Sequence, residues 1–102
     1  MEHMALTETT YYILLSLYEP LHGYGIMQRA AELSGGRVRL AAGTLYGALN
    51  ALVEKGWITL LPGEGRKKEY RLTPRGLEIL KKELARLREL VANGDLVLKE
   101  EA

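Results

Sequence analysis

Cysteine is absent from the 102 residues, which excludes a disulfide framework and any cysteine-based metal site. Aspartate occurs once, as Asp95, and the two histidines are His3 and His22. A Ser-His-Asp arrangement would depend on Asp95 near the C-terminus, and two histidines without a nearby carboxylate pair make a poor metal site. The sequence also lacks a phosphate-binding glycine motif. These absences predict a protein that is not an enzyme and that needs neither a metal nor another cofactor.

Long apolar runs are also missing. No run approaches the roughly 20 residues that span a bilayer. The first residues, Met1-Glu2-His3-Met4, lead into threonine and glutamate, unlike the basic-then-apolar pattern of a signal peptide. We therefore expect no membrane partner and a cytoplasmic location, with which the lack of cysteine agrees.

What the sequence does contain is an ordinary apolar fraction, 47%, and a charge that is unevenly spread. The net charge is +1, but residues 37–75 carry eight basic against three acidic side chains. The flanking segments, 1–36 and 76–102, are net negative. A central basic stretch in a near-neutral chain is typical of a surface that faces phosphates. The length predicts one domain over residues 1–102.

Apolar spacing predicts three helices in the first half of the chain, over residues 7–18, 23–34 and 42–55. Thr7 can cap the first, and glycines at 35–36 and 56 can end the second and third. The buried face of the first should include Tyr11 and Tyr18, and that of the second should include Met27 and Leu33. The third helix has an apolar stripe of Leu45, Leu49, Leu52 and Val53. Residues 37–40 alternate too briefly for more than a bridge or a short strand.

The second half predicts a β-hairpin followed by a long helix. Residues 57–61 and 69–72 are short strand-like runs around a glycine-rich basic tip. Thr73-Pro74 is a favourable helix start, and we expect Asn93-Gly94 to end or bend that helix. The predicted fold is therefore mainly α with a small β-hairpin: a winged helix-turn-helix over 6–72 and a long C-terminal dimerisation helix over 73–93.

In a helix-turn-helix, the second helix of the motif enters the major groove of DNA. Here that helix spans 42–55, and small residues on its exposed face would let the backbone approach closely. Thr44 and Asn50 can bond base edges or phosphates, although Asn50 is equally consistent with a plain solvated position. The basic tip of the hairpin would contact phosphates. The candidate DNA-binding residues are Gly43, Thr44, Tyr46, Asn50, Arg66, Lys67, Lys68, Tyr24 and Arg39.

Three of these side chains have competing interpretations. For Tyr46, the alternative to a DNA contact is that it closes the edge of the core. Tyr24 is expected mainly to pack, with a hydroxyl contact to phosphate as the alternative. Arg39 is balanced between a phosphate contact and plain solvation, and so is Arg37. Trp57 is expected to pack under the hairpin.

The last helix carries a heptad seam that indicates a homodimer. Packing inside the monomer is the alternative, but the last helix has nothing left to cover if the first three helices already form a core. Five aliphatic side chains left in water would be an unusual exposed patch. The candidate dimerisation residues are Leu77, Leu80, Leu84, Leu87 and Val91, with Tyr11 on the apolar face of the first helix.

Two motifs resemble those of the PadR-like transcriptional regulators: His22-Gly23-Tyr24-Gly25-Ile26 and Gly43-Thr44-Leu45-Tyr46. Arg71-Leu72-Thr73 agrees as well, and the resemblance covers about residues 6–92. It implies a winged helix-turn-helix homodimer, usually a repressor, with Thr44 and Tyr46 facing DNA. The chain ends after one C-terminal helix, so it is similar to the short subfamily, whose dimers are built from the first and last helices.

The predicted function is thus sequence-specific binding of double-stranded DNA by a homodimeric transcriptional regulator. A protein-interaction adaptor is one alternative, although an adaptor would tend to display larger apolar anchors on the third helix. An RNA-binding module is the other. A small-molecule effector could bind between the long helices. Some short members hold flat drugs there with a tryptophan, but the only tryptophan here is Trp57, outside that helix.

Overall fold

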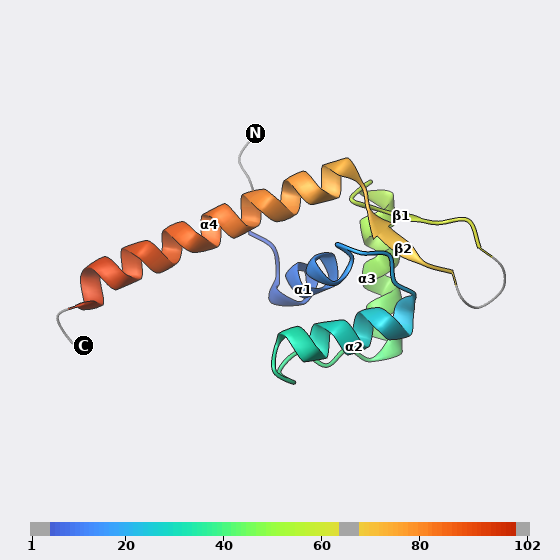
Figure 1. Cartoon of the computed structure of the whole chain (residues 1–102), viewed down its shortest axis with the longest axis horizontal. Helices are drawn as coiled ribbons and strands as arrows, with labels where there is room; N and C mark the ends of the chain where they lie inside the picture. The colour runs from blue at the N-terminus through green and yellow to red at the C-terminus, as the bar shows by residue number, and fades with distance from the viewer. Residues whose placement is uncertain (1–4, 64–67, 100–102) are drawn as a thin grey trace.

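Residues 5–63 and 68–99 are described in the computed structural model. In chain order they form α1 (Glu8–Ser16), α2 (Gly23–Leu33), α3 (Ala42–Glu54), β1 (Ile58–Leu60), β2 (Tyr70–Leu72) and α4 (Pro74–Leu98). Figure 1 shows α1, α2 and α3 gathered near the hairpin, whereas α4 extends away from them. The predicted mainly helical winged helix-turn-helix with a long C-terminal helix is confirmed.

Threonine side chains fix the starts of two helices, as the sequence predicts. The hydroxyl of Thr7 accepts a hydrogen bond from the backbone N–H of Thr10 at 3.1 Å. The hydroxyl of Thr73 accepts one from the N–H of Gly76 at 3.0 Å, and Pro74 occupies the first turn. Each hydroxyl satisfies an N–H group that has no partner within its helix, and such a cap stabilises a helix by about 1 kcal/mol.

Glycines close α2 and α3. Gly35, Gly36 and Gly56 have φ angles of 65°, 87° and 77°, in the region that other residues avoid. The turn after α2 then runs from residue 34 to 41 and leads into α3. This arrangement gives the expected helix-turn-helix, with a turn longer than the tightest version.

The wing is an antiparallel hairpin in which Ile58 faces Leu72 and Leu60 faces Tyr70. A third backbone segment joins it, because Leu21 and Tyr70 exchange hydrogen bonds at 3.1 and 2.8 Å. The expectation of a bridge or strand at residues 37–40 is wrong. The Val38 N–H donates instead to the hydroxyl of Ser34, so it has no strand partner.

The hydrophobic core is shared by all four helices and by β1. Burying each large aliphatic side chain stabilises the fold by roughly 1.5–3 kcal/mol. Trp57 packs against the edge of this core, as expected, and its ring lies 4.7 Å from the Lys55 ammonium. The core residues are Ile13, Leu14, Leu17, Ile26, Leu45, Leu49, Leu52, Ile58, Ile79 and Leu80.

Three residues expected on buried stripes are exposed instead. Tyr18 lies beyond the end of α1, because α1 stops at Ser16. Leu33 is the last residue of α2, past the edge of the core. Val53 is 40% exposed, since it lies at the side of the α3 stripe in the last turn. Helix ends therefore bury less than their periodicity suggests.

Two expectations about the last helix are wrong. Asn93-Gly94 neither ends nor bends it, and α4 continues to Leu98. A glycine in a helix interior costs only about 1 kcal/mol, which is too little to break a long helix. The helix also has core to cover, because Ile79 and Leu80 are 7% and 6% exposed. The first turns of the leucine seam thus serve the monomer.

Candidate nucleic-acid interface

The exposed face of α3 is small and polar. Leu45, Leu49 and Leu52 turn inward, so the other side of the helix meets solvent. A Cβ at Gly43 or at Gly47 would meet no atom of the described residues within 4 Å. The exposed residues of this face include the candidates Gly43, Thr44, Tyr46 and Asn50.

The start of α3 has no side-chain cap. Ala41 occupies the N-cap position and offers no hydroxyl or carboxylate to the first-turn N–H groups. These N–H groups therefore point outward next to Thr44. Such a helix start suits an anion.

Tyr46 joins the two motifs that the sequence singles out. It is 46% exposed, and the covered part of its ring lies against the backbone of Gly23 at the start of α2. Tyr70 of β2 lies near Tyr46. The pKa of Tyr70 is raised mainly by burial and secondly by Tyr46. The phenol of Tyr70 therefore stays protonated at neutral pH. Helix α3, the start of α2 and the base of the wing meet at this point.

The wing presents basic side chains beside this meeting point. Lys68 is exposed, as expected, whereas Arg66 and Lys67 lie outside the described residues. Arg71 is a basic residue that the site prediction omitted. It is exposed on β2 between two inward-facing neighbours, Tyr70 and Leu72. The period-2 alternation of that strand was the signal that could have identified it.

The remaining candidates near α2 differ in how accessible they are. Arg37 pairs with the carboxylate of Glu8 on α1, which raises the pKa of Arg37 and commits it to an intramolecular contact. Arg39 is exposed. The expectation that Tyr24 mainly packs is wrong. It is 62% exposed, because it lies on the outer side of the first turn of α2.

The candidate dimerisation residues divide into two groups. Leu80 is buried in the core, and Leu77, Leu87 and Tyr11 are half-buried. Burial also raises the pKa of the Tyr11 hydroxyl. Leu84 and Val91 are 37% and 62% exposed. Only the second half of α4 therefore presents a largely uncovered apolar surface, and Figure 1 shows this half projecting away from the other helices.

A buried carboxylate joins α4 to the segment before α1. Glu83 is 1% exposed and accepts a hydrogen bond from the Leu6 N–H at 3.2 Å. Arg86 donates to both carboxylate oxygens, at 2.8 and 2.7 Å. Periodicity placed this glutamate on a helix but did not predict its burial.

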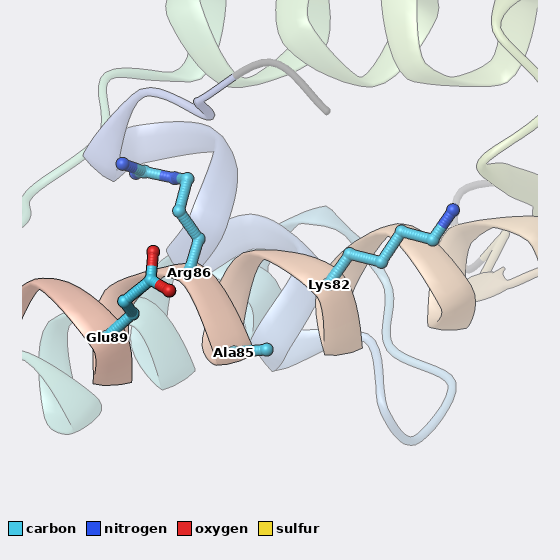
Figure 2. A pocket seen from close by; sticks show the side chains of 4 residues that line it. All are labelled: Lys82, Ala85, Arg86 and Glu89. Carbon is cyan, nitrogen blue, oxygen red and sulfur yellow. The ribbon is translucent and has the colours of Figure 1, made fainter. Parts of the chain in front are cut away.

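A shallow pocket lies along α4, lined by Lys82, Ala85, Arg86 and Glu89. Figure 2 shows the charged ends of Lys82, Arg86 and Glu89 extending to the same side of the helix. Arg86 is already bonded to Glu83, so its guanidinium is committed to a contact within the chain. The pocket does not include the apolar seam residues, so it is distinct from the place where the sequence put an effector.

Within residues 5–63 and 68–99, no three His, Cys, Asp or Glu side chains come together in a way that could hold a metal ion. In the same ranges, no helix has the length and apolar character that crossing a membrane requires.

Comparison with known proteins gives relatives of this architecture. A 37.1 kDa protein from a transposon of Streptomyces fradiae is 44% identical over 64 residues, which are 63% of this chain and 18% of that protein. The chain thus spans less than a fifth of that relative. A PadR-family transcriptional regulator of Eggerthella lenta superposes with a TM-score of 0.71 at 26% identity, over 87% of this chain and 80% of the other.

A third relative was solved with a ligand. PadR of Bacillus subtilis in complex with operator DNA superposes with a TM-score of 0.63 at 31% identity. The match covers 74% of this chain and 45% of that one. The family model of the PadR-like transcriptional regulators matches residues 12–82, from the middle of α1 to the first half of α4. The chain therefore belongs to the PadR-like family of transcriptional regulators.

Proposed function

We propose that this chain binds double-stranded DNA sequence-specifically, with α3 in the major groove and the wing on the phosphate backbone. The observation that carries the proposal is the exposed face of α3, which is open around Gly43 and Gly47 and carries Thr44 and Asn50. The major groove is about 12 Å wide and admits one helix. The solved Bacillus subtilis relative in complex with operator DNA supports the same use of the fold.

The two kinds of contact have different tasks. Thr44 and Asn50 carry hydroxyl and amide groups that can bond base edges, which is how sequence is distinguished. The exposed cations of the wing, Lys68 and Arg71, suit phosphates and fix the position of the protein on the duplex. Tyr46 packs against the start of α2 near Tyr70 of β2, and its hydroxyl can donate to a phosphate.

We further propose that the chain acts as a homodimer and represses transcription. The exposed apolar residues on the second half of α4 support a two-fold contact between copies. Two winged modules would then bind half-sites about one helical turn apart, ~34 Å. Repression follows where such a site overlaps a promoter.

The first experiment is a selection of bound sequences from a library of random duplexes, followed by affinity measurement with the selected duplex. Tyr46→Phe should weaken binding by roughly tenfold or more, since a hydrogen bond to a charged group contributes about 1.5–3 kcal/mol. Tyr18→Phe is the matched control, because Tyr18 is an exposed tyrosine outside the interface. An unchanged affinity for Tyr46→Phe would remove Tyr46 from the site.

Salt dependence tests the wing independently. Each phosphate contact contributes about 0.9 to the slope of log affinity against log salt concentration. Lys68→Ala should therefore flatten that slope by about one per protomer, whereas Lys81→Ala, an exposed lysine on α4, should leave it unchanged. Equal slopes for the two variants would place the wing away from the duplex.

The alternatives give different results in the same assays. An RNA-binding module would prefer a competing RNA to the selected duplex. An adaptor would select no duplex at all. Transcription in vitro from a promoter that carries the selected site should fall when the chain is added, and a rise would identify an activator.

A further inference from the structure

Gly23 lies against the hydroxyl end of the Tyr46 side chain. A Cβ built on Gly23 would come 2.2 Å from the Tyr46 hydroxyl oxygen and 2.8 Å from its ring carbon Cζ. Both distances are far shorter than van der Waals contact. Gly23 is accordingly buried, although it is the first residue of α2. Tyr46 thus occupies the space that any other residue at position 23 would fill.

The backbone itself does not require a glycine at this position. Positive φ angles among the described glycines occur at Gly35, Gly36 and Gly56, and Gly23 is not one of them. A helical position normally favours alanine over glycine. The reason for glycine is therefore the space needed by the aromatic ring, and the sequence accepts a weaker helix start to provide it.

The segment that leads into Gly23 is hydrogen-bonded to the wing. Two residues earlier, Leu21 exchanges two backbone hydrogen bonds with Tyr70 of β2. The Tyr46 ring is therefore located relative to α2 by Gly23 and lies near Tyr70 on the wing side. A side chain that is ordered before binding loses less conformational entropy when its partner arrives.

We propose that Gly23 is a positioning residue for DNA binding, which seats the Tyr46 ring and so aims its hydroxyl at the duplex. The DNA step of this inference rests on the proposed function. Gly23 itself need not touch DNA, because its effect is transmitted through Tyr46. With a side chain at position 23, the flexible ring of Tyr46 swings outward, and the fold survives because only the end of one side chain has to move.

A double-mutant cycle with Tyr46 tests this assignment. Gly23→Ala should lower affinity for the selected duplex by roughly tenfold, the order expected for one lost hydrogen bond to a charged group. In the Tyr46→Ala background the same substitution should change affinity by less than about twofold, because the ring that it displaces is already gone. Gly94→Ala on α4, which meets no described atom within 4 Å, is the control glycine. It should leave affinity for a single half-site unchanged, because Gly94 lies on α4, away from α3 and the wing.

Two outcomes would overturn the inference while leaving the proposed function intact. One is a Gly23→Ala variant that binds the duplex as tightly as the wild type does. The other is an equal loss of affinity in both backgrounds, which would show that Gly23 acts on something other than Tyr46. A wild-type chain that selects no duplex contradicts the proposed function instead, so the two failures are distinguishable.

A measurement without DNA supplies the structural readout. In the free protein, nuclear Overhauser contacts should join the Gly23 α-protons to the ring protons of Tyr46. They should vanish in Gly23→Ala while the dispersion of the core signals is kept. Absence of these contacts from the wild type would refute the seat directly, whatever the protein binds.

Discussion

At Gly76, helix α4 approaches the entry to β1 more closely than any side chain would permit. A Cβ there would lie 1.8 Å from the carbonyl oxygen of Trp57, which is a backbone atom. The same carbonyl accepts a hydrogen bond from the Thr73 N–H, and the Thr73 hydroxyl donates to the carbonyl of Gly56 at 2.6 Å. The start of α4 is therefore attached to the chain that connects α3 with the wing.

We expect Gly76→Ala to destabilise the protein, because neither the helix nor the Trp57 backbone can move without breaking these bonds. Overpacking of this kind costs about 1–3 kcal/mol in the free energy of unfolding, and a backbone collision belongs at the upper end. Urea denaturation measures the change.

Gly94→Ala provides the opposite result on the same helix. Its Cβ would meet no described atom within 4 Å, so in a single copy of the chain the substitution should stabilise α4 by about 0.5–1 kcal/mol through helix propensity. If both alanine variants changed stability by the same amount and in the same direction, close packing at Gly76 would not be the cause.

At the scale of elements, the buried Glu83 holds the segment before α1 against α4. Glu83→Gln keeps the shape of the side chain but removes the charge that Arg86 and the Leu6 N–H both contact. Because Arg86 is 30% exposed, solvent moderates the loss, and we expect about 1–3 kcal/mol in the free energy of unfolding. Chemical denaturation followed by circular dichroism gives the value.

The pair Arg75–Glu78 is the matched control. It has the same spacing on α4, but its side chains are 57% and 53% exposed. Glu78→Gln should therefore change the free energy of unfolding by less than about 0.5 kcal/mol. Equal effects of the two substitutions would mean that burial of Glu83 contributes nothing.

The element boundaries show which features are local enough to be predicted from sequence. Thr7 and Thr73 act within three residues of their own position, and each is a helix cap as predicted. The glycine turns at Gly35 and Gly56 are equally local. The predicted helix end at Asn93-Gly94 is wrong, because the hydrogen bonds on either side outweigh one unfavourable pair inside a long helix.

Contacts between elements could not be predicted from the apolar periodicity of the sequence. The exposed positions Thr44 and Asn50 follow from the apolar stripe of α3, so that part of the candidate site was predictable. The contact between Gly23 and Tyr46 depends on how α2 and α3 cross, which no residue spacing encodes. The burial of Leu80 likewise depends on α4 returning to the core formed by α1.

At the scale of the whole molecule, α4 gives the protein its elongated shape, 56 Å in its longest direction. Its second half carries Leu90, Val91, Leu96, Val97 and Leu98, each at least half exposed. Of these, Val91 and Leu98 continue the heptad seam that begins at Leu77. An apolar stripe that continues from the core into solvent is the surface that a second copy would cover.

We therefore expect Val91→Glu to dissociate the homodimer, because it would bury one charge from each copy at the two-fold contact. Sedimentation equilibrium at micromolar concentration should show a dimer for the wild type and a monomer for this variant. Affinity for a two-half-site duplex should fall with it, while the affinity for a single half-site is kept, because α3 and the wing are unchanged. A wild-type monomer at that concentration would contradict the proposed dimer.

Leu96→Glu tests whether the dimer depends on the heptad seam itself or on any exposed apolar residue of α4. Leu96 is as exposed as Val91, at 66% against 62%, and lies on the same half of α4. At 100° per residue, however, Leu96 points about 140° away from Val91 around the helix axis. It therefore lies on the face of α4 opposite the seam. Leu96→Glu should leave the dimer intact. If it dissociated the dimer as Val91→Glu does, the two helices would meet over a broader surface than the heptad seam, and the pairing geometry inferred from the leucines would be wrong.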